Sequence, residues 1–441
     1  MKRYAQVCIV MAMLALPFTS FTQPVKDTVP QQASLQDCIQ YALKHQPALQ
    51  QALLDEQITE RQIQGRLADW YPQIGLNYSY QYNFQLPAAY FNGSVVKTGT
   101  KNTSTIGIGA TQNLFNRDVL LASRTAGDVR KQYQQATASS KIDIVVNVSK
   151  AFYDVLLAQK QIDLLDDDIA RLEGSLKNAY DQYQGGIVDK TDYKRATISL
   201  NNSKAEKKTT QEALKARLAY LKQQMGYLAP NNITLVYDSA RLADEVSIDT
   251  SAGVRYDNRI EYQQLVTRRR LQVANLQYNK WDYYPTVSAF GTYNLGGFFS
   301  NDFGQLYAHN YANSFAGLQL SFPIFQGGKR VQNIRAAELQ VKRVDWDIAA
   351  LQTAINTEYV QAIGTYKSNL NQYYVLKDNL ALAQEVYNTI QLQYKAGIKT
   401  YLDVIIAESD LRTSQVSYTN ALYEVLSSKL DVQKAMGDIR Y

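Results

Sequence analysis

The sequence predicts an α+β membrane protein in which each half of the chain contributes two β-strands and one long helical hairpin. Three observations lead to this fold class. Motifs recur at a steady spacing of about 211 residues, four runs of about 10 residues alternate apolar with polar side chains, and two segments of some 65 residues favour unbroken helix. Alternating runs of that length fit tilted strands that cross a membrane.

The internal repeat is visible in matched motifs. Tyr183-Gln-Gly-Gly-Ile187 returns as Tyr394-Lys-Ala-Gly-Ile398, about 211 residues later. The other matched pairs are Asp192 with Asp403, Leu165 with Leu376, Met225 with Met436, and Trp70-Tyr-Pro72 with Tyr283-Tyr-Pro285. Because the offset is steady, we expect a structural duplication with repeats at 24–226 and 256–441 and a linker at 227–255.

Residues 1–23 are expected to form a cleaved export signal. Two basic residues precede a short apolar stretch at 7–16, and small or polar residues at 19–23 offer a cleavage site. The apolar stretch is too short to span a membrane as a helix. Cys8 lies too early to accept a lipid anchor, and after cleavage Cys38 alone remains, so no internal disulfide can form.

Composition argues against nucleic-acid binding and against catalysis. The formal charge is only +6 over 441 residues, and the basic residues are interspersed with acidic ones. His45 and His309 have no cysteine or acidic partner at ligand spacing, and no phosphate loop, nucleophile elbow or HExxH motif occurs. Met225 and Met436 are too few for a path for soft metal ions. We therefore expect no enzyme activity, cofactor or metal site.

The first helix and its exit are marked by capping and proline signals. Ser34-Leu-Gln-Asp37 is a capping box that opens the helix, and Pro47 is expected to kink it. Pro72 and Pro285 stand just before the first strand of each half, where proline suits a helix-to-strand corner. Pro323 lies in Phe-Pro-Ile-Phe325-Gln-Gly-Gly, which leads from the last strand back into a helix.

Four alternating runs predict strands at about 73–85, 102–115, 286–296 and 313–325. The apolar positions of the first run are Ile74, Leu76, Tyr78, Tyr80, Tyr82 and Phe84. The residues between them are small, uncharged polar groups or glycine, as a water-filled lumen requires. The chain also has 33 tyrosines, whose apolar ring and polar hydroxyl suit a membrane interface. Periplasmic hairpins packed on a core are the alternative.

Four strands cannot close a barrel, and in lipid every strand edge must be paired. The sequence therefore predicts that several chains contribute four strands each. Three chains would give 12 strands, but the duplication alone does not choose the number.

The long segments predict helices of about 100 Å, from about residue 118 to 183 and in the matching part of the second half. Apolar side chains recur with gaps of four and three at Leu165, Ile169, Leu172, Leu176, Ala179 and Tyr183, and at Leu376, Leu380, Ala383, Tyr387, Ile390 and Tyr394. This heptad pattern calls for helix partners, which the returning helices at about 191–225 and 401–436 provide. Several copies would form a tube; a solid coiled-coil bundle is the alternative.

Over essentially its whole mature length, the chain resembles the TolC-type outer-membrane efflux proteins. The resemblance rests on the duplication, the proline corners, the Phe-Pro-Ile-Phe325 segment and the Tyr-x-x-Gly-Ile tips. It implies a homotrimeric 12-stranded β-barrel, with four strands per chain, in outer-membrane lipid. An antiparallel α-helical coiled-coil tunnel would continue this barrel into the periplasm of a Gram-negative cell.

The same resemblance implies a passive exit duct of a tripartite efflux or type I secretion system. A periplasmic adaptor and an inner-membrane RND or ABC transporter would dock on the duct and open its periplasmic end. Drug efflux and protein secretion use the same kind of duct. A non-channel coiled-coil scaffold or adhesin, periplasmic or at the cell surface, is the alternative function.

The hairpin tips are the candidate site. Gly185, Gly186 and Gly397 permit the positive φ that a reversing helix needs, and Tyr183 and Ile398 flank these turns, where the resemblance implies adaptor docking.

By the same resemblance, Asp192, Tyr394 and Lys399 match a latch that holds the tunnel end shut. Lys399 stands where some relatives have arginine, so a bidentate clamp is lost. Asp403 matches an acidic ring in the pore. A second acidic position of that ring is Ile406 here, so the ring would carry fewer charges.

Overall fold

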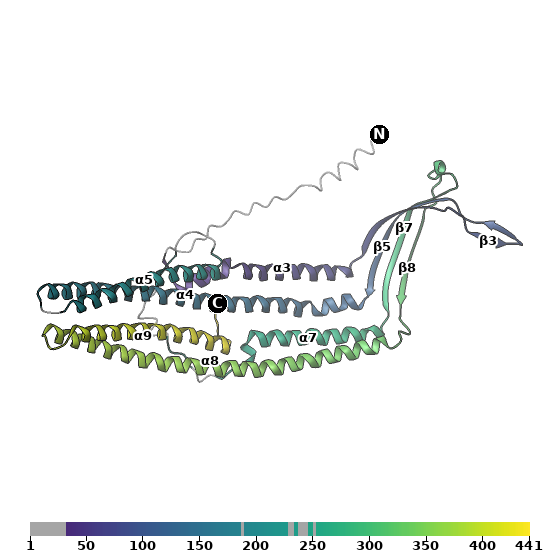
Figure 1. Cartoon of the computed structure of the whole chain (residues 1–441). Helices are drawn as coiled ribbons and strands as arrows, with labels where there is room; N and C mark the ends of the chain where they lie inside the picture. Colours follow the sequence, from purple (N-terminus) through teal and green to yellow (C-terminus); the bar gives the residue numbers. More distant parts are fainter. Residues whose placement is uncertain (1–31, 187–188, 228–232, 237–245, 250–252) are drawn as a thin grey trace.

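The chain is elongated, with a β-sheet at one end and two helical hairpin tips at the other (Figure 1). A computed structural model describes residues 32–186, 189–227, 233–236, 246–249 and 253–441. The expected export signal at 1–23 and much of the expected linker at 227–255 lie outside the described residues. Within the described ranges, no helix has an apolar stretch of the length that a bilayer crossing requires.

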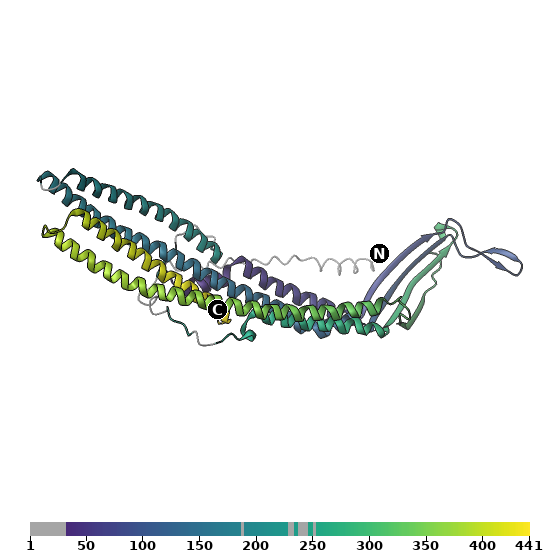
Figure 2. The ribbon, with the colours of Figure 1, turned by 60° about the horizontal axis from the view of Figure 1, so that its bottom comes forward.

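Two long helices form the frame of the molecule. They are α4 (Arg117–Gln184, 68 residues) and α8 (Lys329–Lys395, 67 residues), each about 100 Å long at 1.5 Å per residue. Four shorter helices lie along them in two end-to-end pairs, α3 (Pro47–Leu67) and α5 (Lys190–Met225) on α4, and α7 (Ile260–Lys280) and α9 (Tyr401–Met436) on α8 (Figures 1 and 2). The order α3, α4, α5 in the first half thus matches the order α7, α8, α9 in the second.

The first helix is divided at Pro47. The capping box opens α2 (Leu35–His45), where the Asp37 N–H donates to Ser34 Oγ at 3.3 Å and the Ser34 N–H to Asp37 Oδ2 at 2.9 Å. The expected kink is instead a break: Gln46 is extended, and Pro47 is the first residue of α3. A residue before proline is disfavoured in the helical region, so a second helix starts here.

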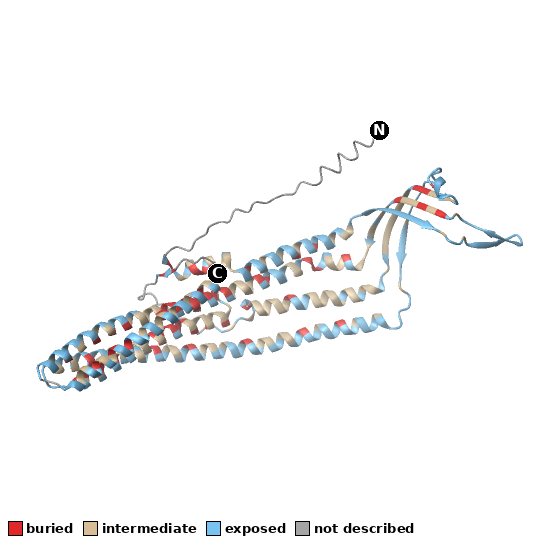
Figure 3. Cartoon of the chain, turned by 45° about the horizontal axis from the view of Figure 1, so that its top comes forward, coloured by how far each residue is buried: buried red, intermediate tan, exposed pale blue. Residues whose placement is uncertain are grey.

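The hydrophobic core lies in the middle of the molecule, where α2 and the end of α5 pack against α4 and α9 (Figure 3). Its members with almost no exposure include Cys38, Ala42, Val148, Phe152, Leu156, Leu221, Met225, Val425 and Leu426. Burial of each large aliphatic side chain contributes about 1.5–3 kcal/mol. The hairpins beyond this core are packed by two smaller clusters of buried residues.

The sheet has four antiparallel strands in the order β2-β5-β7-β8. They are β2 (Gln73–Tyr82), β5 (Asn102–Phe115), β7 (Thr286–Ser300) and β8 (Asn313–Ser321). The central pair β5 and β7 joins the two halves of the chain, with register shifts at two points. Among the described residues, β2 and β8 are each paired along one side only.

Two strands end earlier than the alternation suggested. β8 stops at Ser321, because Pro323 has no N–H for the ladder and Gly327 and Gly328, with φ of 57° and 82°, turn the chain into α8. β2 stops at Tyr82 rather than 85, while β7 continues to Ser300.

A separate hairpin follows β2, made of β3 (Ala88–Phe91) and β4 (Ser94–Lys97). Its Asn92-Gly93 turn has both residues at positive φ. Asn-Gly is a strong hairpin signal, yet this hairpin was not among the predicted strands.

A buried arginine at the start of α7 binds groups of the three helices α7, α8 and α9. Arg259 is only 4% exposed. Its guanidinium donates to Glu358 Oε2 of α8 at 2.8 Å and to Glu261 Oε2 of α7 at 3.0 Å. It also donates to the carbonyl oxygens of Lys434 and Ala435 in the last turn of α9, and the Lys434 oxygen accepts in addition from the Gly437 N–H.

Candidate functional site

The two hairpin tips are built by glycines that end the long helices. Gly186 and Gly397 have φ of 70° and 75°, and their N–H groups donate to the carbonyl oxygens of Tyr183 and Tyr394 at 3.0 and 2.9 Å. Gly185 differs from the expectation: its φ is −75°, so it continues the right-handed turn and donates to the Asp181 carbonyl. One left-handed residue is enough to end each helix.

An aromatic and an aliphatic side chain flank these turns. Tyr183 packs on Tyr193 of α5 with ring centroids 5.1 Å apart, so it braces the first tip. Ile398 is 73% exposed at the second tip. Its counterpart Ile187 lies outside the described residues. Exposed apolar side chains at a helix end are candidates for a protein contact.

A hydrogen bond between Tyr394 and Gln182 joins the two hairpins near the tips. The Tyr394 hydroxyl donates to Gln182 Oε1 of α4 at 2.8 Å. Burial raises the pKa of Tyr394 above its ordinary value, and the nearby Asp192 carboxylate adds to the increase. Gln182 was not among the predicted residues, because nothing in the sequence distinguishes it from other polar side chains on α4.

The other two predicted residues are engaged at the start of α9. Asp403 Oδ2 accepts from the Thr400 N–H at 2.9 Å and from its hydroxyl at 2.8 Å, which completes a capping box. Lys399 Nζ lies 3.8 Å from Asp403 Oδ1. Within one chain, Lys399 therefore contacts its own hairpin, and the structure does not bring it to Asp192 and Tyr394.

The capping interactions also set the charge of Asp403. The hydrogen bonds from the Thr400 backbone and hydroxyl, with Lys399 nearby, hold its pKa below the ordinary value. This carboxylate is therefore ionised at neutral pH. The Thr400-x-x-Asp403 spacing is a sequence signal that could have shown this role.

The hairpins pack around a cavity of about 350 Å³ beside this hydrogen bond. Its lining residues include Asn178, Gln182, Gln391, Tyr394 and Tyr401. Tyr401 is buried against Ala179, Ala196 and Val404. Burial raises the pKa of its hydroxyl, although Ser175 of α4, which also lines the cavity, opposes the increase.

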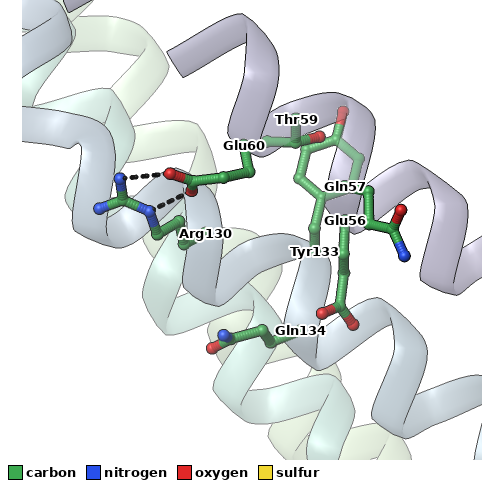
Figure 4. Close-up of a pocket in the computed structure, with 7 residues that line it drawn as sticks. All are labelled: Glu56, Gln57, Thr59, Glu60, Arg130, Tyr133 and Gln134. Carbon is green, nitrogen blue, oxygen red and sulfur yellow. Dashed lines mark hydrogen bonds and ion pairs between the residues drawn. The ribbon is translucent and has the colours of Figure 1, made fainter. Parts of the chain in front are cut away.

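A second hollow, of about 250 Å³, lies between α3 and α4, far from the tips (Figure 4). Its charged groups already bind each other, since Arg130 donates to both carboxylate oxygens of Glu60 at 2.5 and 3.1 Å. The described part of the chain contains no cluster of three potential metal ligands. The tips are thus the better candidate site.

Comparison with known proteins decides the family. The model of the outer membrane efflux protein family matches residues 38–227 and 257–438. The chain belongs to this family. This match confirms the family resemblance predicted from the sequence. The family consists of transport proteins rather than of enzymes.

Relatives extend over most of the chain. Outer membrane protein TolC of Escherichia coli is 22% identical over 433 residues, covering 93% of this chain and 83% of the relative. TolC of Vibrio cholerae is 21% identical, covering 76% of each. The toluene efflux pump outer membrane protein TtgC of Pseudomonas putida is 22% identical, covering 92% of this chain and 83% of the relative.

Solved structures share the fold. The outer membrane protein VceC of Vibrio cholerae superposes with a TM-score of 0.73 at 16% identity, covering 91% of this chain and 96% of that one. CusC gives a TM-score of 0.76 at 18% identity, covering 96% of both. This outer membrane efflux protein therefore has the helical-plus-sheet fold of efflux channels. It lies in the outer membrane of a Gram-negative cell and serves as an exit duct, as the sequence predicted.

Proposed function

We propose that this protein is the outer-membrane component of a tripartite efflux system, and that three copies form one 12-stranded barrel continued by a helical tunnel. The observation that carries this proposal is the four-stranded sheet whose outer strands, β2 and β8, each have one unpaired side among the described residues. Unpaired edges are not stable in lipid, so β8 of one copy would pair with β2 of the next.

The exposed side chains of the sheet support a lipid contact. Apolar residues on alternate positions of the two outer strands are largely exposed in a single chain: Ile74, Leu76, Tyr78, Leu318 and Leu320. A lipid-facing band covers such residues without a protein partner. Each chain supplies two strand pairs and two helical hairpins. A small number of subunits is therefore enough to close a ring.

Partners of the duct are proposed from its relatives and its tips. Several relatives are named as outer membrane proteins of efflux pumps, which act with other components. A periplasmic adaptor would bind the hairpin tips, where Tyr183 and Ile398 flank the turns, and an inner-membrane RND or ABC transporter would complete the assembly. A detergent-extracted trimer that forms ion-conducting pores would support this function. A soluble monomer released by osmotic shock would contradict it and favour a scaffold.

The tips are proposed to close the tunnel. The bond between Tyr394 and Gln182 joins the hairpins, Asp192 lies close to it, and Lys399 and Asp403 sit at the start of α9. Separation of the hairpins by an adaptor would break the bond and widen the tunnel end.

Loss of the Tyr394 hydroxyl is expected to loosen this end. Tyr394→Phe and Asp192→Ala should each raise single-channel conductance in planar bilayers, because a contact between hairpins or its charged neighbour is removed. Tyr180→Phe is a matched control: among the described residues its hydroxyl accepts from Gln184, within α4, at 2.9 Å. The control should leave conductance unchanged. Unchanged conductance in both tip variants would exclude the latch.

Removal of the Asp403 charge is expected to reduce the cation preference of the pore. Asp403→Asn keeps an oxygen that can accept from Thr400, so the helix start should persist. The reversal potential under a salt gradient measures the preference. Asp189→Asn removes a charge from the other tip and serves as the control. Equal shifts in the two variants would show a general surface charge effect rather than a ring at Asp403.

A further inference from the structure

A cluster of charged and polar side chains lies inside the helical region, away from the tips. Its members are Asp168 and Arg171 of α4, Ser203 and Glu206 of α5, and Glu408 and Arg412 of α9. We call it the cross-hairpin cluster. Asp168 and Glu408 are only 2% and 4% exposed. Asp168 is 16 residues from the end of α4, a distance of roughly 24 Å along the helix.

The polar contacts of this cluster that join the hairpins involve Glu408 or Arg412. Arg412 donates to Ser203 Oγ at 3.1 Å, lies 3.6 Å from Asp168 Oδ2, and pairs with Glu206. Arg171 Nε lies 3.4 Å from Glu408 Oε1. The contacts within the first hairpin (α4 and α5) are separate: Ser203 Oγ donates to Asp168 Oδ2 at 2.8 Å. Movement of α9 would therefore break the links that cross.

The cluster contains one more acid than base. Three carboxylates, those of Asp168, Glu206 and Glu408, face two arginines. Arg171 lies beside both buried carboxylates, and Arg412, which lies 3.6 Å from Asp168, is shared with Glu206. An uncompensated charge in a buried position is unfavourable, so a proton on one carboxylate relieves the imbalance.

Glu408 is the group placed to take that proton. Burial, together with the nearby Asp168 carboxylate, raises the pKa of Glu408 to about 6, although Arg171 opposes the increase. From α8, Tyr387 faces Glu408, and its own pKa is raised by burial and by that carboxylate. Burial and the Glu408 carboxylate likewise raise the pKa of Tyr401 in α9. These phenols and the arginines keep their protons between pH 5 and 7.5.

We propose that the cross-hairpin cluster is a second latch of the duct, which holds α9 against α4 and α5, and that a proton on Glu408 strengthens it. This inference rests on the proposed function, in which opening separates the two hairpins.

The direction of the effect follows from the position of Glu408. In the closed state its pKa is above the ordinary value of 4.5. When α9 moves away, water reaches the carboxylate and its pKa falls back. Protonation therefore favours the closed state, and this preference is lost as the pH rises through about 6. The difference between the two pKa values limits the change in the closed-to-open ratio to about 30-fold per chain.

Conductance as a function of pH tests the second latch. The Tyr394→Phe background, with its tip loosened, should show an open probability that falls between pH 7.5 and 5.0. Adding Glu408→Gln, a neutral group of the same shape, should remove this dependence. The open probability should then stay, at every pH in this range, at the low value seen at pH 5.0. Asp403→Asn in that background is the control, because the pKa of Asp403 lies below the window and the dependence should persist. A pH response that survives Glu408→Gln would overturn the proposal.

Hydrogen exchange provides a readout that needs no working gate. After correction for intrinsic rates, residues 196–206 and 404–412 should be better protected at pH 5 than at pH 7.5 in the wild type and equally protected in Glu408→Gln. Equal protection in the wild type would refute the second latch, whatever the conductance. Tyr394→Phe could fail to raise conductance while the pH-dependent protection is still observed. That result would contradict the proposed gate at the tips and support the second latch.

A second variant covers the case in which Glu408→Gln does not fold. Glu206→Gln removes a half-exposed negative charge and leaves Arg412 more available to Asp168. Glu408 then has less uncompensated charge nearby, so the midpoint of the pH response should move to lower pH. A midpoint that stays in place would contradict the charge imbalance on which the latch depends.

Discussion

Alanine at Gly226 or Gly437 is expected to destabilise the middle of the molecule by about 3 kcal/mol or more. These glycines end α5 and α9 with φ of 67° and 73°. A Cβ on Gly226 would lie 2.7 Å from the His45 carbonyl oxygen and 2.8 Å from the Gln46 Cα, and one on Gly437 would lie 2.8 Å from the Asn258 carbonyl oxygen. The neighbours are backbone atoms, so relief requires a shift of the chain where α3 or α7 begins.

The tip glycines are the matched controls for this effect. Gly186 and Gly397 have nearly the same φ, of 70° and 75°, but an added Cβ would have no neighbour within 4 Å. Alanine there should cost only the left-handed strain, about 1 kcal/mol. Thermal unfolding followed by far-UV circular dichroism in detergent measures the difference. Equal shifts in midpoint at the four sites would show that conformation, not packing, accounts for the effect.

Arg259→Ala is expected to cost about 3–5 kcal/mol, because it removes the guanidinium that pairs with Glu358 and donates to the Ala435 carbonyl group at the end of α9. Arg259→Lys keeps the charge but loses the planar fork, so it should recover only part of the stability. The same unfolding measurement applies.

Arg269 provides the comparison on the same helix. Its pair with Asp345 is about half exposed, and exposed pairs contribute little. Arg269→Ala should therefore leave the unfolding midpoint nearly unchanged. A loss as large as that of Arg259→Ala would show that charge removal from α7, rather than the buried contacts of Arg259, destabilises the protein.

The features that could be predicted from the sequence are those that depend on patterns of neighbouring residues. Period-two alternation located the main strands, the absence of proline over long segments located α4 and α8, and glycine at the tips located the turns. The predicted strand ends were less accurate, since the alternation of apolar residues continues through Phe322 and Ile324 while Pro323 prevents pairing. Local signals were also overlooked, at Asn92-Gly93 and at Thr400-x-x-Asp403.

The cross-hairpin contacts could not be predicted from the sequence. Asp168 and Glu408 look like ordinary solvated charges on amphipathic helices. They lie 240 residues apart in the chain and become buried only because the two hairpins pack together. The same holds for Gln182, whose role depends on where Tyr394 of the other hairpin lies. Such contacts depend on the relative rotation of long helices, which a heptad pattern constrains only loosely.

The two unlike edges of the sheet have a genetic consequence. In the proposed ring every junction joins β8 of one chain to β2 of another, so a single faulty edge leaves the ring open. If a cell made intact and edge-damaged chains in equal amounts, random assembly would leave only about one ring in eight free of faulty subunits. Alleles that damage an edge but spare the fold would be dominant. Alleles that unfold the chain would be recessive, since their products never enter a ring.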